Sequence, residues 1–351
     1  MCDMNLDNLL KKCIESGDLS REEIVFLLSL KDEADVARLI AAADEVRKRY
    51  CGDEVHIRGL IEFSNICKND CLYCGLRRSN KSVNRYRMTP DEIVEMAVKL
   101  ADKKIQTIVL QSGEDLKFTR EVVADIVRRI KFVTDIAVTL CLGERPFEDY
   151  ALWKEAGADR YLLRHETSNP ELFRKMHPDS TLEARLGCLR ELKRLGYQIG
   201  AGCMVGLPGQ TVEDMANDIL LFKELDVDMA GIGPFIPHPD TPLGDAAQGS
   251  LEMTLKMVAL ARIVTRNALL PATTAAGSVD EFGREKALQA GANVVMPNHT
   301  PLVYRVDYEI YPNKRCITED PEKCGACLTA RILSVGRTVA TGKGHSLKRR
   351  I

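Results

Sequence analysis

The sequence predicts a large α/β domain built as a complete (β/α)8 (TIM) barrel, with helices before it and a cysteine-containing tail after it. From residue 55 onward, short apolar runs alternate with segments whose apolar residues stand three and four positions apart, the patterns of strands and helices. Eight alternations follow one another over about 240 residues without a low-complexity linker. Such even spacing favours a closed barrel over a doubly wound open sheet, the alternative fold.

Each part of this architecture has its own signal in the chain. Residues 1–50 read as an N-terminal helical extension, and residues 299–351 as the tail. Between them, 51–298 form the predicted barrel, in which Thr89 is expected to cap a helix that begins with Pro90. The candidate strands are residues 55–64, 107–113, 136–143, 160–166, 198–207, 229–236, 270–275 and 292–297.

The composition excludes some classes of function. A formal net charge of −2 gives no electrostatic reason to expect a nucleic acid or an anionic membrane as partner. The chain lacks both an apolar run of the roughly 18 residues that a membrane helix needs and a secretory signal, so we expect a cytoplasmic protein. Twelve cysteines then indicate metal or cluster ligation rather than disulfides.

Charged residues recur on one face of two candidate strands. Arg160, Arg164 and Glu166 share a face of the fourth strand, and Arg58 and Glu62 share a face of the first. The apolar residues that alternate with them are expected to face the helices, which turns the charges into the barrel. Because buried charges are unfavourable unless they are paired or used, we predict a ligand cavity inside the barrel.

Three cysteines, Cys67, Cys71 and Cys74, follow the first strand in the segment CKNDCLYC. Barrel enzymes carry their catalytic groups on loops at the carboxyl ends of the strands. Thiolates are the ligands of iron–sulfur clusters, and three of them leave one iron of a cubane open to a substrate or cofactor. A zinc site is one alternative, although no second pair of ligands lies nearby, and unbonded buried cysteines are another.

This CX3CX2C spacing, with Tyr73 before the last cysteine, resembles the signature of the radical S-adenosylmethionine (radical SAM) superfamily. The resemblance implies that Cys67, Cys71 and Cys74 are catalytic and hold a 4Fe-4S cluster whose open iron binds S-adenosyl-L-methionine (SAM). It also implies reductive cleavage of SAM to methionine and a 5′-deoxyadenosyl radical, with a reductant such as ferredoxin or flavodoxin.

Further residues resemble the SAM contacts of that superfamily. The segment SGED (112–115) resembles the motif that receives the SAM amino group. Glu166 suits the ribose and Arg185 the carboxylate, because a carboxylate accepts hydroxyl hydrogen bonds and a guanidinium binds a carboxylate with two. A solvated helix face is the alternative place for Arg185. The implied cofactor contacts are Tyr73, Gln111, Ser112, Gly113, Glu114, Thr139, Glu166, Arg185 and Met229.

A second cysteine group, Cys316, Cys324 and Cys327, lies in the predicted tail with the spacing CX7CX2C. A second cluster here, of the 2Fe-2S or 4Fe-4S type, would again lack one protein ligand. A zinc site or a vestigial group is the alternative. Since the group follows the barrel, we expect it to lie outside the central chemistry.

Longer stretches narrow the resemblance to the radical SAM enzymes that mature FeFe-hydrogenase. These stretches include EFSNICKNDCLYCGLRRSN, IVLQSGED, GADRYLLRHET and GIGPFIPHPDTPL. The resemblance implies a small anionic or organometallic substrate, a cysteine-bound iron carbonyl–cyanide precursor of the hydrogenase H-cluster, and other hydrogenase maturases as partners. The implied substrate contacts are Arg160, Arg164, Thr273, Thr274, Met296, Tyr308 and Tyr311.

Three alternative functions remain open. A radical mutase such as methylornithine synthase resembles the same barrel, although the tail cysteines favour the maturase group. Biotin synthase inserts sulfur from a cluster inside its barrel, whereas the second cysteine group here is expected outside. A non-catalytic cluster carrier would need neither the charged cavity nor the SAM contacts.

Overall fold

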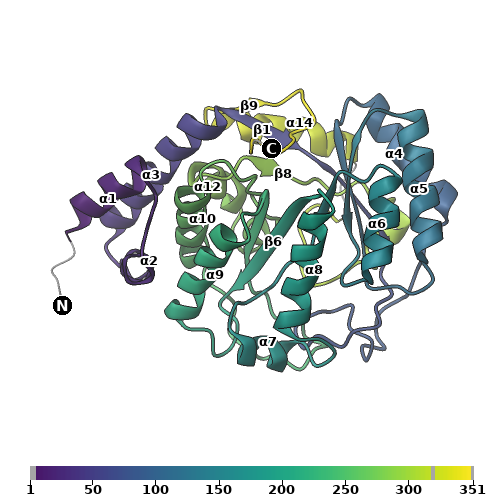
Figure 1. The fold of residues 1–351 in the computed structure, drawn as a ribbon, viewed down its shortest axis with the longest axis horizontal. Coiled ribbons are helices and arrows are strands. Elements are labelled where there is room, and N and C mark those ends of the chain that lie inside the picture. The colour runs from purple at the N-terminus through teal and green to yellow at the C-terminus, as the bar shows by residue number, and fades with distance from the viewer. Residues whose placement is uncertain (1–4, 318–320, 349–351) are drawn as a thin grey trace.

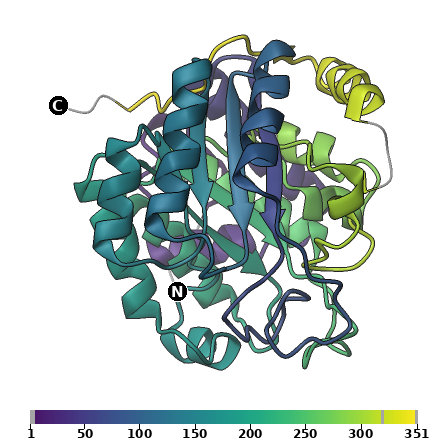
Figure 2. The ribbon, with the colours of Figure 1, turned by 90° about the vertical axis from the view of Figure 1, so that its right-hand side faces the viewer.

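The computed structural model describes residues 5–317 and 321–348, and it describes no side chains for residues 321–324. Strands alternate with helices, and the helices surround the strands (Figures 1 and 2). The strands are β1 (Glu54–Ile57), β2 (Gly59–Ser64), β3 (Thr107–Ser112), β4 (Ala137–Cys141), β5 (Arg160–Leu162), β6 (Gln198–Val205), β7 (Met229–Pro234), β8 (Val294–Val295) and β9 (Thr338–Val339). The helices are α1 (Leu6–Glu15), α2 (Arg21–Leu28), α3 (Glu33–Cys51), α4 (Pro90–Asp102), α5 (Arg120–Val133), α6 (Phe147–Glu155), α7 (Pro170–Met176), α8 (Leu182–Arg194), α9 (Val212–Glu224), α10 (Leu251–Thr265), α11 (Thr274–Val279), α12 (Gly283–Gln289), α13 (Leu302–Arg305) and α14 (Pro321–Ser334).

The barrel closes because its first and last strands pair with each other. Strands β2 to β7 form one parallel sheet in chain order, and β1 pairs in parallel with β8. β1 and β2 form one strand interrupted at Arg58, whose amide still donates to Val295 O at 2.9 Å. Leu269 and Pro271 form single bridges to β7 and β8 and fill the remaining gap. The predicted complete barrel is therefore confirmed, and the open sheet is excluded.

Several strands are shorter than predicted, among them 292–297, which is reduced to β8. Two others are shortened for a local reason. The expected strand 270–275 is reduced to bridges, because Pro271 has no N–H to donate and Thr273 already caps α11. β5 ends at Leu162, and Glu166 beyond it has a positive φ of 64°. Both irregular segments lie at the carboxyl ends of strands, where the cavity opens.

The predicted N-terminal helices are present and pack on the outside of the barrel. α3 lies against α10, and α2 lies against α9. The predicted cap of α4 is also present, because Thr89 Oγ1 accepts from Glu92 N at 3.3 Å and Pro90 is the first helical residue. In the described part of the chain, no helix combines the length and apolar composition needed to cross a bilayer.

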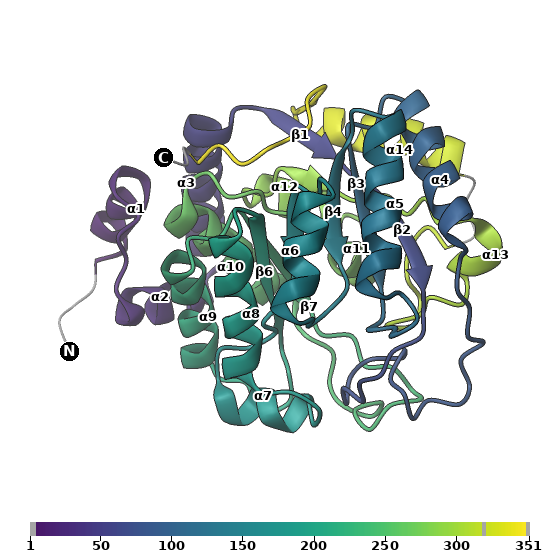
Figure 3. The same ribbon diagram turned by 45° about the vertical axis from the view of Figure 1, so that its right-hand side comes forward.

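The tail contributes to both ends of the barrel. Residues 308–314 follow α13 and provide part of the cavity wall at the carboxyl ends of the strands. After α14 the chain reaches the opposite end, where β9 pairs in parallel with β1. Residues 340–348, which we call the strap, then cross the amino-terminal opening of the barrel. Figure 3 shows this yellow segment at the top, while α7 and the loops that follow the strands lie at the bottom.

Candidate functional site

A cavity of about 370 Å³ lies inside the barrel. Its lining begins at the three cysteines after β2 and includes Arg58, whose Nη2 donates to Gly344 O of the strap at 3.3 Å. Arg58, Glu62, Arg164 and Glu166 all line this space. The cavity and the inward direction of these four charges were predicted from strand parity, and both are confirmed.

The loop that carries the cysteines (residues 65–88) is held by side chains. It contains almost no regular structure, so its carbonyl groups need other hydrogen-bond partners. Arg85 supplies four of these bonds at once, and its guanidinium spans the loop. The acceptors are the carbonyl oxygens of Asn65, Leu76, Arg77 and Asn80, at 2.6 to 3.0 Å.

The segment after β3 packs directly on the cysteine loop. A Cβ at Gly113 would lie 2.3 Å from Ile66 O and 2.9 Å from Cys67 Cβ, so only glycine fits there. The next amide, Glu114 N, lies 3.4 Å from Cys67 Sγ and donates to it. The predicted SGED motif therefore supports the first cysteine.

The three cysteines are half-buried, and their thiols lie close enough to act on one another electrostatically. Burial raises the pKa of Cys67, and burial together with the charges of Cys74 and Cys67 raises that of Cys71 well above its ordinary value. Burial and Cys67 raise the pKa of Cys74 to about 12. Three thiols that oppose each other's ionisation fit a positively charged metal group that binds them as thiolates. The donor set therefore suits an iron–sulfur cluster.

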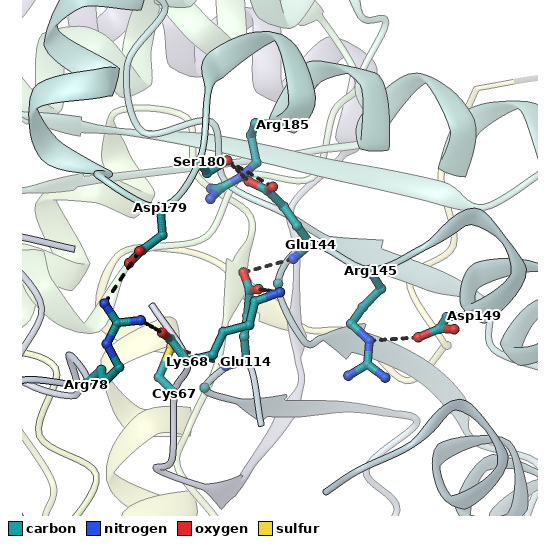
Figure 4. Close-up of polar contacts among 12 residues, drawn as sticks. Cys67, Lys68, Arg78, Glu114, Glu144, Arg145, Asp149, Asp179, Ser180 and Arg185 are labelled. Atoms are coloured by element: carbon teal, nitrogen blue, oxygen red, sulfur yellow. Dashed lines mark hydrogen bonds and ion pairs between the residues drawn. The ribbon is translucent and has the colours of Figure 1, made fainter. Parts of the chain in front are cut away.

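A network of polar contacts connects the candidate SAM contacts beside the cysteines (Figure 4). Arg185 forms an ion pair with Glu144, and Ser180 Oγ donates to the same carboxylate at 2.7 Å. Glu144 N donates to Glu114 Oε1 at 3.0 Å, and Arg185 Nη1 donates to Arg164 O at 2.6 Å. Arg185 is 6% exposed, which excludes the solvated helix face.

Arg164 and Glu166 form an ion pair at the end of β5. Arg164 Nη2 lies 3.1 Å from Glu166 Oε2 and donates to Cys203 O at 2.7 Å. A Cβ at Gly202 would lie 2.9 Å from Arg164 Cγ, so this glycine makes room for the arginine. The backbone of Glu166 has a left-handed conformation. For a residue other than glycine this conformation costs about 1–3 kcal/mol, and such strain is common in binding sites.

Most of the remaining predicted contacts also line the cavity. Thr139 Oγ1 is buried there and has no hydrogen-bond partner among the described residues, which suits a ligand. Gln111 Nε2 donates to Tyr308 OH at 3.2 Å, and Met229 Sδ accepts from Arg58 Nη1 at 2.9 Å. The structure brings to this cavity Tyr73, Gln111, Ser112, Gly113, Glu114, Thr139, Arg164, Glu166, Arg185, Met229, Thr273, Thr274, Met296, Tyr308 and Tyr311.

Arg160 differs from the other candidate substrate contacts, because the structure places it beneath the cavity and not among the lining residues. Its Nη2 donates to Lys343 O at 2.8 Å and to Gly344 O at 3.0 Å, and its Nη1 donates to Thr107 Oγ1 at 3.2 Å. Strand parity gave its face correctly but could not give its depth along the barrel axis. The donors of Arg160 are therefore engaged by the strap, by Thr107 and, through Nε, by Gln198.

Two of the tail cysteines line a separate, smaller pocket. Cys316 and Cys327 lie there with the cations Arg284, Arg315 and Arg331, and Cys316 has a positive φ of 63°. Thiolates are soft ligands for zinc and for iron–sulfur clusters, so two thiols in one pocket are compatible with a metal group as well. The side chain of Cys324 lies outside the described residues.

Among the residues that sequence reasoning missed are two charged ones, Lys314 and Glu144. Lys314 reaches the cavity from the tail, and no strand period signalled it. Glu144 anchors Arg185 from the turn after β4, and its only signal was its place in that turn. Both act through contacts between segments far apart in the chain, which local patterns do not encode.

Comparison with known proteins agrees with this geometry. The model of the radical SAM superfamily matches residues 61–262, more than half of the chain. The FeFe-hydrogenase maturase subunit HydE of Thermotoga maritima is 55% identical over 92% of this chain and 93% of its own length. A 3-methylornithine synthase of Methanosarcina acetivorans is 30% identical over 88% of this chain and 89% of its own length.

The fold has a close match among solved structures. The crystal structure of a methylornithine synthase superimposes with a TM-score of 0.83 at 26% identity, and the match covers 95% of this chain and 97% of that one. The matched superfamily, the relative with 55% identity and the closed barrel with three cysteines at its mouth all agree. The chain therefore belongs to the radical SAM superfamily and, within it, to the HydE family of FeFe-hydrogenase maturases.

Proposed function

We propose that this enzyme processes a cysteine-bound iron carbonyl–cyanide precursor of the hydrogenase H-cluster inside the barrel cavity. One observation carries the proposal: the three cysteines and the charged side chains Glu62, Arg164 and Lys314 line one cavity. A small anionic or organometallic substrate in that space lies within reach of chemistry started at the thiols. Other hydrogenase maturases are the proposed partners, and ferredoxin or flavodoxin the proposed reductant.

The protein's part in this reaction is to bind, orient and exclude water. When bound, the 4Fe-4S cluster on Cys67, Cys71 and Cys74, together with SAM, supplies a 5′-deoxyadenosyl radical. We assign Glu114 to the amino group of SAM and Arg185 to its carboxylate, because each is already fixed by the contacts around Glu144. The strap closes the far end of the barrel, which limits the access of water to a radical.

Two assays on the same anaerobically reconstituted protein test this proposal. The first measures 5′-deoxyadenosine after reduction, and the second measures activation of apo-hydrogenase in the presence of the other maturases. We expect Cys71→Ala to abolish both, because it removes a cluster ligand. Cys188→Ala is the matched control, since Cys188 is a partly buried cysteine on α8 outside the cavity, and it should leave both unchanged. If the wild type cleaves SAM but the hydrogenase stays inactive, the maturation role is wrong.

We also propose a second cluster, 2Fe-2S or 4Fe-4S, on Cys316, Cys324 and Cys327. The support is the pocket in which two of these thiols lie among three arginines. Cys327→Ala should lower the iron content by two to four atoms per chain, as one such cluster holds. We expect 5′-deoxyadenosine formation to continue in this variant, because the pocket is separate from the cavity. Loss of SAM cleavage in Cys327→Ala would contradict this division of roles.

A further inference from the structure

The cavity wall contains a buried ion pair between the barrel and the tail. Glu62 lies on β2, and Lys314 comes from the segment that follows α13. Lys314 Nζ contacts Glu62 Oε1, and the side chains of Lys314 and Glu62 are 5% and 1% exposed. Both residues line the cavity that also receives the cysteine thiols.

Stability alone is a poor explanation for this pair. A buried ion pair loses the hydration of both charges, and well-packed apolar residues of similar volume often stabilise a protein as well or better. The surroundings hold the pair in one position: Asn298 Nδ2 donates to Glu62 Oε2 at 2.6 Å, and the Tyr308 ring lies 5.1 Å below Lys314 Nζ. Charges that are held this firmly at a cavity wall suit ligand recognition.

The pair keeps hydrogen-bonding capacity for a ligand. An ammonium group has three N–H donors, and Lys314 uses one on Glu62 and directs a second at Tyr308 O, 3.5 Å away at the limit of a hydrogen bond. At least one donor therefore has no acceptor within the described part of the chain. Glu62 accepts from Lys314 and Asn298, and a carboxylate has about four acceptor positions.

A donor and an acceptor side by side select a particular ligand chemistry. A simple anion would be attracted by Lys314 but repelled by Glu62. A simple cation would be attracted by Glu62 but repelled by Lys314. An ammonium and a carboxylate on one carbon atom satisfy both partners together. We propose that Lys314 and Glu62 bind the amino and carboxylate groups of an α-amino acid portion of the substrate. This assignment rests on the proposed function in placing the substrate in this cavity.

Three variants and a matched control separate recognition from a structural role. Lys314→Met and Glu62→Gln each leave one buried charge alone, and the thermal midpoint of each should fall by several degrees. The double variant has neither charge, and its midpoint should return toward that of the wild type. Lys256→Met is the control, because Lys256 is a buried lysine on α10 that contacts Leu30 O at 2.9 Å and is not among the residues that line the cavity.

The binding measurement uses L-cysteine as the probe, titrated calorimetrically into anaerobic, SAM-loaded protein. We expect the double variant to bind L-cysteine at least tenfold more weakly than the wild type, although its thermal midpoint has recovered. The control should bind as the wild type does. Equal affinity in the wild type and the double variant, or no binding by the wild type, would overturn the assignment. Weaker binding of SAM itself by the double variant would also overturn it, since the pair would then belong to the cofactor.

This design keeps the two proposals apart. If the wild type binds L-cysteine through the pair but does not mature hydrogenase, the proposed function fails and the pair's role holds. If maturation succeeds and the double variant matures hydrogenase as well as the wild type, the pair's role fails and the proposed function holds.

Discussion

The two ends of the barrel cavity are built from the same strands but neutralise their cations differently. At the carboxyl ends, Arg164 pairs with Glu166 and Arg185 pairs with Glu144. At the amino-terminal end, Arg58 and Arg160 both donate to backbone carbonyls of the strap, and the charges of Asp159 and Asp228 also act on Arg160.

This difference indicates that one end of the barrel recognises ligands and the other end is closed to solvent. A carboxylate balances a full charge and fixes the direction of a guanidinium, so a cofactor or substrate meets a prearranged donor. Carbonyl dipoles balance less of the charge, and burial lowers the pKa of Arg160 to about 10 and that of Arg58 well below its ordinary value. We infer that the end of the cavity at the carboxyl ends of the strands (the mouth) binds ligands. The end covered by the strap (the floor) closes the barrel.

We expect the largest effect from Gly113→Ala, which disturbs the packing of the segment after β3 on the cysteine loop. The new Cβ would lie 2.3 Å from Ile66 O, and backbone on both sides cannot move away cheaply. We expect the cysteine loop to shift and the iron bound per chain at the first cluster to fall at least tenfold. Iron analysis and 5′-deoxyadenosine formation measure this loss.

Gly187→Ala is the matched control for that change. Gly187 lies inside α8, where an added Cβ would meet nothing within 4 Å. Alanine there should stabilise the protein by about 0.5–1 kcal/mol and leave the cluster intact. If Gly113→Ala keeps its iron, the close packing of β3 on the cysteine loop is not what positions Cys67.

Arg164→Met and Arg160→Met sharpen the comparison between the two ends. We expect Arg164→Met to lower hydrogenase maturation at least tenfold, because it removes the cavity's donor beside Glu166. Arg160→Met should destabilise the protein by about 2 kcal/mol, since strap carbonyls lose a charged donor, but should keep most of the maturation activity. The reverse pattern would place the substrate near the strap and remove the distinction between the ends.

The sequence predicted the fold and much of the mouth because both are encoded locally. Strand and helix periods gave the eightfold alternation, and the cysteine spacing gave the thiols that meet at one end of the cavity. Parity placed Arg58, Glu62 and Arg164 inside the barrel. These signals need only a short window of residues.

What the sequence could not give depends on contacts between distant segments. The depth of Arg160 is set by the strap, more than 180 residues later in the chain. Lys314 enters the cavity from an irregular segment whose path is fixed by the barrel it covers. Such a residue becomes buried only when distant segments pack together, so the strand and helix periods of the sequence do not predict its burial.

A smaller effect, the dependence of stability on pH, also distinguishes the two ends. Burial lowers the pKa of His177, near the cysteine loop, to about 3, and that of His56, near the strap, to about 4. Unfolding returns both to about 6.5, so the unfolded chain binds protons in this window and the folded chain does not. Stability is therefore complete above about pH 6.5 and is lost as the pH falls, by at most about 1.4 kcal/mol per pH unit for each histidine.

Thermal midpoints at each pH unit from 7 to 3 for the wild type, His177→Gln and His56→Gln measure these contributions. Each variant should lose less stability on acidification than the wild type does. The difference should persist down to about pH 3 for His177 but only to about pH 4 for His56, because each contribution ends at the folded pKa. A variant that follows the wild-type curve would show that its histidine is already hydrated in the folded state. For His56, that result would mean that water reaches the floor of the barrel past the strap.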